Sequence, residues 1–180
     1  WLPGATSPSQ SSDWNKGAVV TGQIGWKETV YLDGSYRRDW YRAFRQFKDR
    51  GTPEDYGYFG FGANAIVSNL VQLPEWFNYL KYRASYSEVG NSIPGIVYAG
   101  ATRNFETGAL VPSSWATFKN PLPEKTASFE TGIEALFLNN RLSFDLTYYN
   151  STMSNLYLVG TNASGKSIPM NTCKIRNQGV

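Results

Sequence analysis

The chain has 180 residues, of which 16% are aromatic and 17% charged, and its formal net charge at pH 7 is only +3. This charge is too small to indicate nucleic acid as a partner. The chain has one cysteine and no histidine, which excludes an internal disulfide, a metal site built on His and Cys, and a histidine-dependent catalytic set. No pair of carboxylates stands out as an acid/base set, so we expect neither an enzyme nor a bound cofactor.

The first predicted elements form a β-hairpin. Apolar and polar side chains alternate over 20–26 and again over 30–37, which is the period of two that a strand imposes. The polar turn at 27–29 closes the hairpin with Trp26 opposite Val30. The apolar faces of the two strands then agree.

The next two strands are predicted over 56–68 and 80–87. In the second, Lys81 and Arg83 alternate with apolar residues. Burial of these two side chains inside a sandwich would leave uncompensated charges, so this face of the strand needs water.

The clearest hairpin lies between Ser128 and Asn150. Its two runs alternate regularly around Asn139-Asn140, a dipeptide that tolerates the positive φ of a tight primed turn. That turn sets Phe137 opposite Leu142, Ala135 opposite Phe144, Ile133 opposite Leu146 and Thr131 opposite Tyr148. One face of the hairpin is apolar and the other polar.

The connections are predicted to alternate in length, with a short helix possible in the second because Trp40, Phe44 and Phe47 fall at i, i+4 and i+7. Short turns at one end of a sheet and long loops at the other are typical of an outer-membrane β-barrel. With 174–180 as the start of another strand, the chain holds about seven strands. The predicted connections are a leading loop at 1–17, then 27–29 (short), 39–55 (long), 69–79 (intermediate), 89–125 (long), 139–140 (short) and 151–172 (long).

Basic residues cluster only between 37 and 50. One interpretation of this run is a site for phosphate or anionic lipid, and the other is a solvated loop with mixed charges. The residues are Arg37, Arg38, Arg42, Arg45, Lys48 and Arg50.

Three stretches and the C-terminal run resemble the barrel of the SusC/RagA family of TonB-dependent outer-membrane transporters from Bacteroidetes. The resemblance covers roughly 19–180, in the order and spacing of that family. It rests on YLDGSYRRDW (31–40), LPEWFNYLKYRASYSEVGN (73–91), SFETGIEALFLNNRLSFDLTYYN (128–150) and KIRNQGV (174–180).

This resemblance implies an all-β, antiparallel, up-and-down transmembrane barrel of 22 strands with a plug, of which residues 1–180 are an incomplete segment. It also implies an importer of oligosaccharides or peptides in the bacterial outer membrane, with outer-membrane lipid around it. Its expected protein partners are a SusD-like surface lipoprotein that covers the barrel and TonB, which acts through a part outside this chain.

On this interpretation the polar faces line the lumen, as wall and plug contacts more often than as substrate contacts. Aromatic side chains in the long loops could instead stack on sugar rings, or pack the loops together. The predicted lumen residues are Asp33, Arg37, Asn64, Lys81, Arg83, Glu130, Glu134 and Asp145. The predicted substrate-binding residues are Trp14, Trp40, Tyr41, Phe105 and Trp115.

Two other classes of protein remain as alternatives. A soluble carbohydrate-binding β-sandwich would suit the aromatic content and the missing catalytic set. It would have to place Lys81, Arg83, Glu130 and Glu134 on a solvated face while the same strands supplied a core. A fragment of a glycoside hydrolase is disfavoured because no acid/base pair stands in a recognisable setting.

Overall fold

The computed structural model describes residues 14–45, 53–92, 102–103, 110–111 and 121–180. Seven strands form one sheet in the order β1-β2-β3-β4-β7-β8-β9, and every neighbouring pair is antiparallel. A separate two-stranded ladder joins β5 and β6. The strands are β1 (Asn15–Trp26), β2 (Val30–Tyr41), β3 (Asp55–Ile66), β4 (Phe77–Asn91), β5 (Thr102–Arg103), β6 (Leu110–Val111), β7 (Glu124–Phe137), β8 (Leu142–Thr161) and β9 (Ser167–Gly179).

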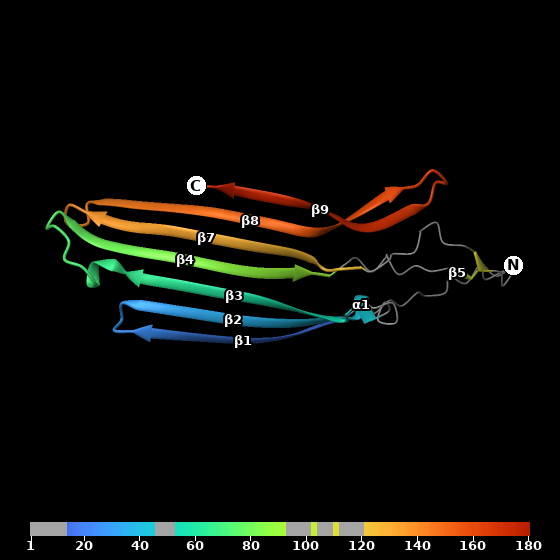
Figure 1. The fold of residues 1–180 in the computed structure, drawn as a ribbon, viewed down its shortest axis with the longest axis horizontal. Coiled ribbons are helices and arrows are strands. Elements are labelled where there is room, and N and C mark those ends of the chain that lie inside the picture. The colour runs from blue at the N-terminus through green and yellow to red at the C-terminus, as the bar shows by residue number, and fades with distance from the viewer. Residues whose placement is uncertain (1–13, 46–52, 93–101, 104–109, 112–120) are drawn as a thin grey trace, which may run out of the picture.

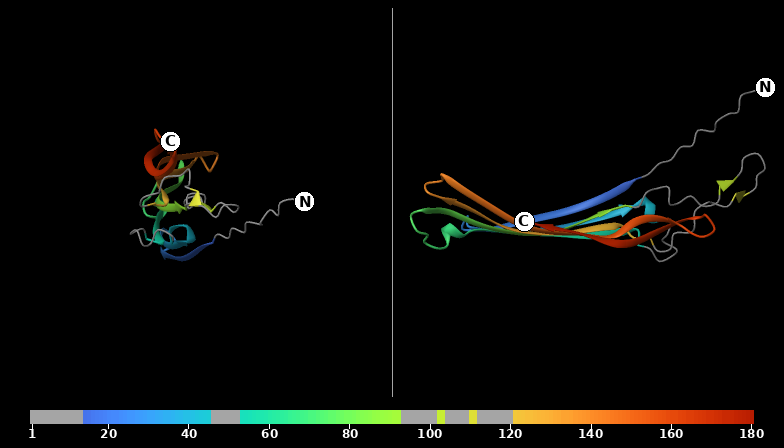
Figure 2. Two further views of the ribbon diagram at one scale, coloured as in Figure 1. Left: turned by 90° about the vertical axis from the view of Figure 1, so that its right-hand side faces the viewer. Right: turned by 90° about the horizontal axis from the view of Figure 1, so that it is seen from above.

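The seven strands make a single twisted layer in which they follow one another in chain order, and β4 lies beside β7 because β5 and β6 form their own ladder (Figure 1). Seen from above, the layer is thin along its whole length (Figure 2). The predicted up-and-down, all-β architecture is therefore confirmed. A sandwich would need a second sheet against the first, and the described residues provide only the small β5–β6 ladder. Within this part of the chain no helix is long and apolar enough to cross a membrane.

Both predicted hairpin registers are correct. Trp26 pairs with Val30 at the β1–β2 turn. In the β7–β8 hairpin, Ile133 pairs with Leu146. The φ angles of Asn139 and Asn140 are 58° and 63°, the left-handed values that a primed turn requires, and the Arg141 amide donates to the Leu138 carbonyl at 3.3 Å.

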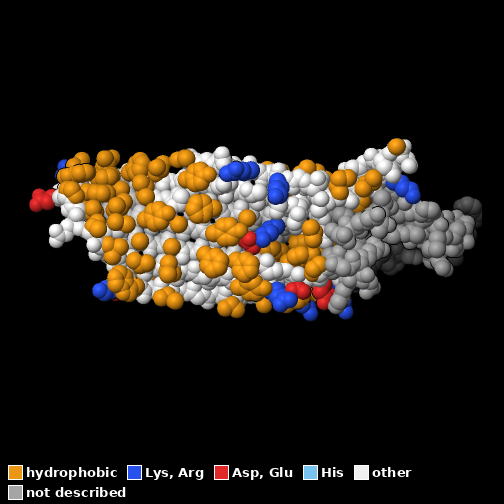
Figure 3. Space-filling view, in the orientation of Figure 1, with side chains coloured by type: hydrophobic (Ala, Val, Ile, Leu, Met, Phe, Trp, Pro, Cys, Tyr) orange, Lys and Arg blue, Asp and Glu red, His pale blue; other side chains and the backbone are white. Residues whose placement is uncertain are grey.

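One face of the sheet is apolar and uncovered. Its side chains include Ile24, which is 74% exposed, together with Val20, Leu32, Phe61 and Phe144. Figure 3 shows this face, with apolar side chains densest over the left and middle of the sheet and a few charged ones at the left end, in the middle and toward the right. We call it the outward face. Because none of the described residues covers this apolar surface, we expect it to face an apolar partner outside them.

The main packed cluster lies at the end of β2, where the predicted short helix is present as α1 (Arg42–Arg45). Phe44 of this helix is 0% exposed. Its ring contacts Tyr41 at 5.5 Å and Tyr56 at 5.2 Å between centroids, both edge-on. The connection between β2 and β3 is thus shorter than predicted and held by aromatic contacts.

The prediction of a long loop over 151–172 is wrong. β8 continues to Thr161 and β9 begins at Ser167, so only five residues connect them. Asn162 organises this turn, because its Oδ1 accepts hydrogen bonds from the amides of Ser164 (3.0 Å) and Lys166 (2.8 Å). Asn155 and Cys173 have φ of 57° and 62°, and these two irregular positions interrupt the alternation by which a strand is recognised.

β1, β2 and β4 are also longer than predicted, because their polar ends do not alternate clearly, whereas β3 (Asp55–Ile66) nearly matches the predicted 56–68. β1 begins at Asn15, inside the predicted leading loop, and β2 runs to Tyr41. β4 spans Phe77–Asn91, and a 3-10 turn at Val67–Asn69 precedes it. The short connections 27–29, 67–76 and 138–141 still share one end of the sheet (Figure 1).

The Asn139-Asn140 turn yields a test in the full-length protein. Asn140→Val should lower the free energy of unfolding by about 1–2 kcal/mol, because a β-branched residue is strained at positive φ. Asn140→Gly should leave it nearly unchanged. Urea unfolding in detergent micelles measures both, and equal effects of the two substitutions would show that the left-handed turn is not required.

Candidate functional site

The face opposite the apolar one carries the charged side chains. The register places Lys81 beside Glu134, and Glu134 beside Asp145. One step further along the strands, Asn64 lies beside Arg83. The eight side chains predicted for the lumen share this face by alternation and register: Asp33, Arg37, Asn64, Lys81, Arg83, Glu130, Glu134 and Asp145.

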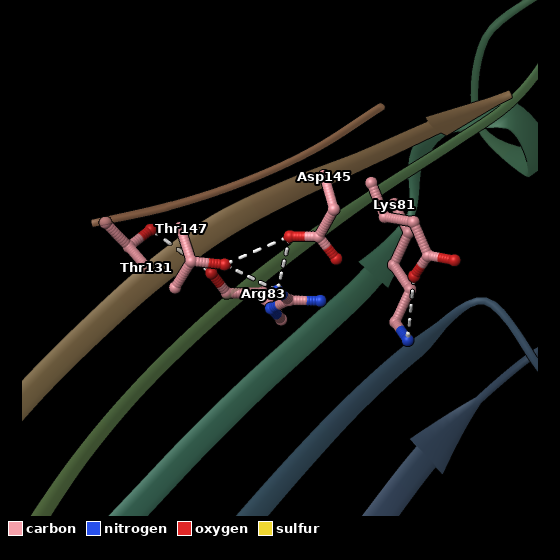
Figure 4. A network of polar contacts seen from close by, with 6 residues as sticks. Lys81, Arg83, Thr131, Asp145 and Thr147 are labelled. Carbon is pink, nitrogen blue, oxygen red and sulfur yellow. Dashed lines mark hydrogen bonds and ion pairs between the residues drawn. The ribbon is translucent and has the colours of Figure 1, made fainter. Parts of the chain in front are cut away.

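Arg83 is the centre of a polar network on this face (Figure 4). Its Nη2 lies 2.8 Å from Asp145 Oδ1 and donates to Thr147 Oγ1 at 2.6 Å. Lys81 Nζ lies 3.7 Å from Glu134 Oε2. The Arg83 and Asp145 side chains remain 35% and 53% exposed, so water screens the attraction and the network contributes little to stability.

A glycine makes room for the Arg83 guanidinium. A Cβ at Gly132 would lie 2.9 Å from Thr147 Oγ1 and 3.1 Å from Arg83 Nε. The bare backbone leaves a shallow hollow of ≈ 140 Å³ lined by Arg83, Thr147, Asp33, Asn64, Gly62, Ala84, Ser85, Glu130 and Thr131. Both signs of charge therefore border one small polar space.

A second polar cluster lies on the same face near the end of β2. Arg37 Nε donates to Asp39 Oδ1 at 2.8 Å and to Oδ2 at 2.9 Å. Tyr41 Oη donates to Asp39 Oδ2 at 3.2 Å and lies 3.3 Å from Tyr58 Oη. Burial raises the pKa of the Tyr41 phenol, and its contacts with Tyr58 and Asp39 raise it further, so the phenol stays protonated as a donor. This cluster borders a hollow of ≈ 220 Å³ that Asn91 also lines.

Three of the five aromatic residues predicted to bind substrate lie around one pocket. Trp14, Trp40 and Tyr41 line one pocket of ≈ 450 Å³ with Lys16, Arg45 and Glu54. Alternation places Tyr41 on the polar face and Trp40 on the outward face, so the pocket lies where the two faces meet at the strand ends. Phe105 and Trp115 fall outside the described residues.

The sequence analysis missed a cluster of hydrogen-bonded side chains at the point where the β3–β4 ladder ends. The ladder between these strands stops at Gly60↔Ser87, and the Glu88 carboxylate accepts a hydrogen bond from the backbone of Phe59 beyond that point. Lys125 Nζ lies 2.8 Å from Glu88 Oε1, and Tyr86 Oη donates to the same oxygen at 2.6 Å. Alternation predicts ladders but not where they end, so no pattern in the sequence indicates this group of side chains.

Asp39 and Tyr58 were missed for a different reason. Their strands were predicted correctly, but the first was ended at residue 37, before Asp39. Extending the alternation by four residues, to the observed end of β2, would have placed Asp39 and Tyr41 on the face of Arg37.

Residues 1–180 match the protein family described as TonB dependent receptor-like, beta-barrel. No curated protein matches the chain. Among solved structures, the RagAB peptide transporter is similar at 23% identity and a TM-score of 0.72, over 92% of this chain and 19% of that one. The RagAB peptide importer in a closed-closed state is similar at 21% identity and a TM-score of 0.72, over 91% of this chain and 18% of that one.

The chain thus spans about a fifth of the length of the solved structures that it matches. The family match and the two RagAB structures support the predicted resemblance to the SusC/RagA family. Proteins of this family are receptors and transporters rather than enzymes. The single-layer sheet, the uncovered apolar face and the match over residues 1–180 agree: the chain belongs to the TonB dependent receptor-like β-barrel family of the bacterial outer membrane.

Proposed function

We propose that the chain is a barrel segment of a TonB-dependent nutrient importer that takes up peptides or oligosaccharides. The observation that carries this proposal is the division of one antiparallel sheet into an uncovered apolar face and an ion-paired polar face. A membrane-spanning barrel needs this division, because lipid meets one face of its strands and water the other.

The seven strands form part of a larger barrel domain in this proposal. In the described sheet β1 and β9 each pair with a strand on one side only, and an open edge is not tolerated in lipid. Further strands from outside these residues therefore close the barrel. The connections 27–29, 67–76 and 138–141 lie on the periplasmic side, and the connections 42–54, 92–123 and the five-residue turn 162–166 lie on the cell surface, where outer-membrane barrels carry their longer loops.

The polar face lines the lumen, where its charges pair with one another and contact a plug. Arg83, Lys81 and their acidic partners lie toward the periplasmic end, whereas Arg37, Asp39 and Tyr41 lie at the mouth. The mouth cluster suits cargo, because Arg37 can bind a peptide carboxylate and Tyr41 can contact a sugar ring. The cargo role of Trp14 and Trp40 stays a prediction.

The partners follow from the same proposal. A SusD-like surface lipoprotein covers the mouth formed by the long connections. TonB supplies the driving force through a part of the protein outside these residues. The matched RagAB structures, described as a peptide transporter and a peptide importer, favour peptides as the first cargo to test.

Spin labels can test which face meets lipid. In a full-length Cys173→Ser background, needed because Cys173 is exposed, a label at Ala84→Cys should collide more with oxygen than with a water-soluble nickel chelate. The neighbouring Ser85→Cys should give a much lower oxygen-to-nickel ratio, because strand neighbours point to opposite faces. Similar ratios at the two positions would refute the division into lipid and lumen faces.

Growth on single nutrients tests import. Deletion of the full-length gene should abolish growth on at least one peptide or oligosaccharide at a limiting concentration, and the wild-type gene should restore it. Arg37→Gln should restore growth less well, with an apparent half-saturation concentration raised about tenfold, if Arg37 forms a charge-assisted hydrogen bond with cargo. Normal growth of the deletion strain on every peptide and oligosaccharide tested would argue against an import role.

A further inference from the structure

Tryptophan and basic side chains alternate on the outward face where β1 and β2 extend past the apolar residues. Lys16 pairs with Trp40 across the two strands. Lys16 Nζ lies 4.9 Å from the centroid of the Trp14 ring, and the Arg38 guanidinium carbon lies 5.8 Å from that of Trp40. Each cation is thus held over an indole on its own strand.

These side chains border a preformed space. The ≈ 450 Å³ pocket of Trp14, Lys16 and Trp40 is completed by Arg45 of α1, with Tyr41 and Glu54 also lining it. α1 is anchored by the fully buried Phe44, so Arg45 extends from a fixed helix. A volume of this size is in the range of small-ligand pockets.

The charges around the pocket favour an anion. Two cations, Lys16 and Arg45, line the pocket with one carboxylate, Glu54. Arg38 lies beside Trp40 and forms an ion pair with Asp55. Guanidinium groups bind phosphate in a bidentate manner and ammonium groups bind it as point charges. The indole faces offer a platform for the apolar face of a sugar ring.

The apolar surface continues directly from this pocket. On the outward face of β1, Lys16 is followed by Ala18, Val20 and Ile24, and both Val20 and Ile24 are more than 70% exposed. A ligand with a charged sugar headgroup and acyl chains can therefore bind the pocket and the apolar strands together. A soluble cargo would satisfy only the pocket.

We propose that Trp14, Lys16, Trp40 and Arg45 bind the phosphorylated sugar headgroup of a glycolipid in the outer leaflet. The proposal rests on the orientation given under the proposed function, with the long connections at the cell surface. It gives a role to Arg45, which belongs to the basic run of 37–50.

Lipid binding to the purified full-length protein tests this site. The melting temperature in detergent is measured while rough lipopolysaccharide is titrated, and again with the same lipid after removal of its phosphates. The intact lipid should raise the melting temperature of the wild type. Lys16→Gln/Arg45→Gln should need about tenfold more lipid for half of the shift, because two charge-assisted hydrogen bonds to phosphate are lost.

Lys27→Gln is the matched control. Lys27 Nζ lies 4.8 Å from the Trp26 ring, which makes the same kind of pair at the opposite end of β1, so this variant should bind like the wild type. Trp40→Leu provides a second variant that keeps apolar bulk, and it should also weaken the response. The melting temperature without lipid shows whether each variant folds.

The proposal would be overturned if intact and dephosphorylated lipid raised the melting temperature equally, or if Lys27→Gln weakened the lipid response as much as Lys16→Gln/Arg45→Gln. It would also be overturned if inorganic phosphate at millimolar concentration competed fully with the lipid, which would indicate a small-anion site. Failure of the import proposal is seen separately, as normal growth of the deletion strain. A wild type that restores growth but shows no phosphate-dependent lipid response would refute only the glycolipid site.

Discussion

The structure depends on the hydrogen bonding of its backbone in an apolar surrounding. Each strand in lipid must give its N–H and C=O groups to a neighbouring strand, because no water is available to pair with them. This requirement explains the single continuous ladder from β1 to β9. It also explains why the fold does without a conventional core. Stability comes from the ladders and from the medium around them, and among the described residues the cluster of Phe44, Tyr41 and Tyr56 packs around a fully buried aromatic ring.

The same constraint shows where the apolar band ends. The first charges on the outward face of β2 and β3 are Arg38 and Asp55, and these two form an ion pair. Five residues further along β3 from Asp55, the β3–β4 ladder stops at Gly60↔Ser87, and the Glu88 carboxylate accepts a hydrogen bond from the backbone of Phe59. Paired outward charges and side-chain substitutes for ladder bonds both need water or headgroups nearby. The pocket of Trp14 and Trp40 lies at this boundary.

Much of the fold could be predicted from the sequence because the period of two is strong where lipid faces one side. The predicted pairings of Trp26 with Val30 and of Ile133 with Leu146 were both correct. A one-residue slip would have turned every apolar side chain of the strand to the opposite face. The prediction failed over residues 151–172, where the irregular positions Asn155 and Cys173 break the alternation of β8 and β9. The polar face could be assembled by alternation alone, whereas the pocket of Trp14, Trp40 and Arg45 depends on the position of α1, which no pattern within a strand specifies.

The β8–β9 hairpin, which was predicted as a loop over 151–172, holds the start of β7 in place. Asn171 of β9 accepts a hydrogen bond from the Leu122 amide at 2.7 Å, and its Nδ2 donates to the carbonyls of Leu122 (2.9 Å) and Asn155 (2.7 Å). Glu124 Oε1 in turn accepts from the Tyr157 amide at 2.9 Å. A flexible loop over 151–172 could not hold these partners. The hairpin is instead a firm extension of the sheet, and it secures the point where the chain leaves the connection 92–123 and enters β7. The strand ladder that pairs the backbone N–H and C=O groups in lipid therefore continues beyond the apolar residues. There it supports the longest connection between these strands.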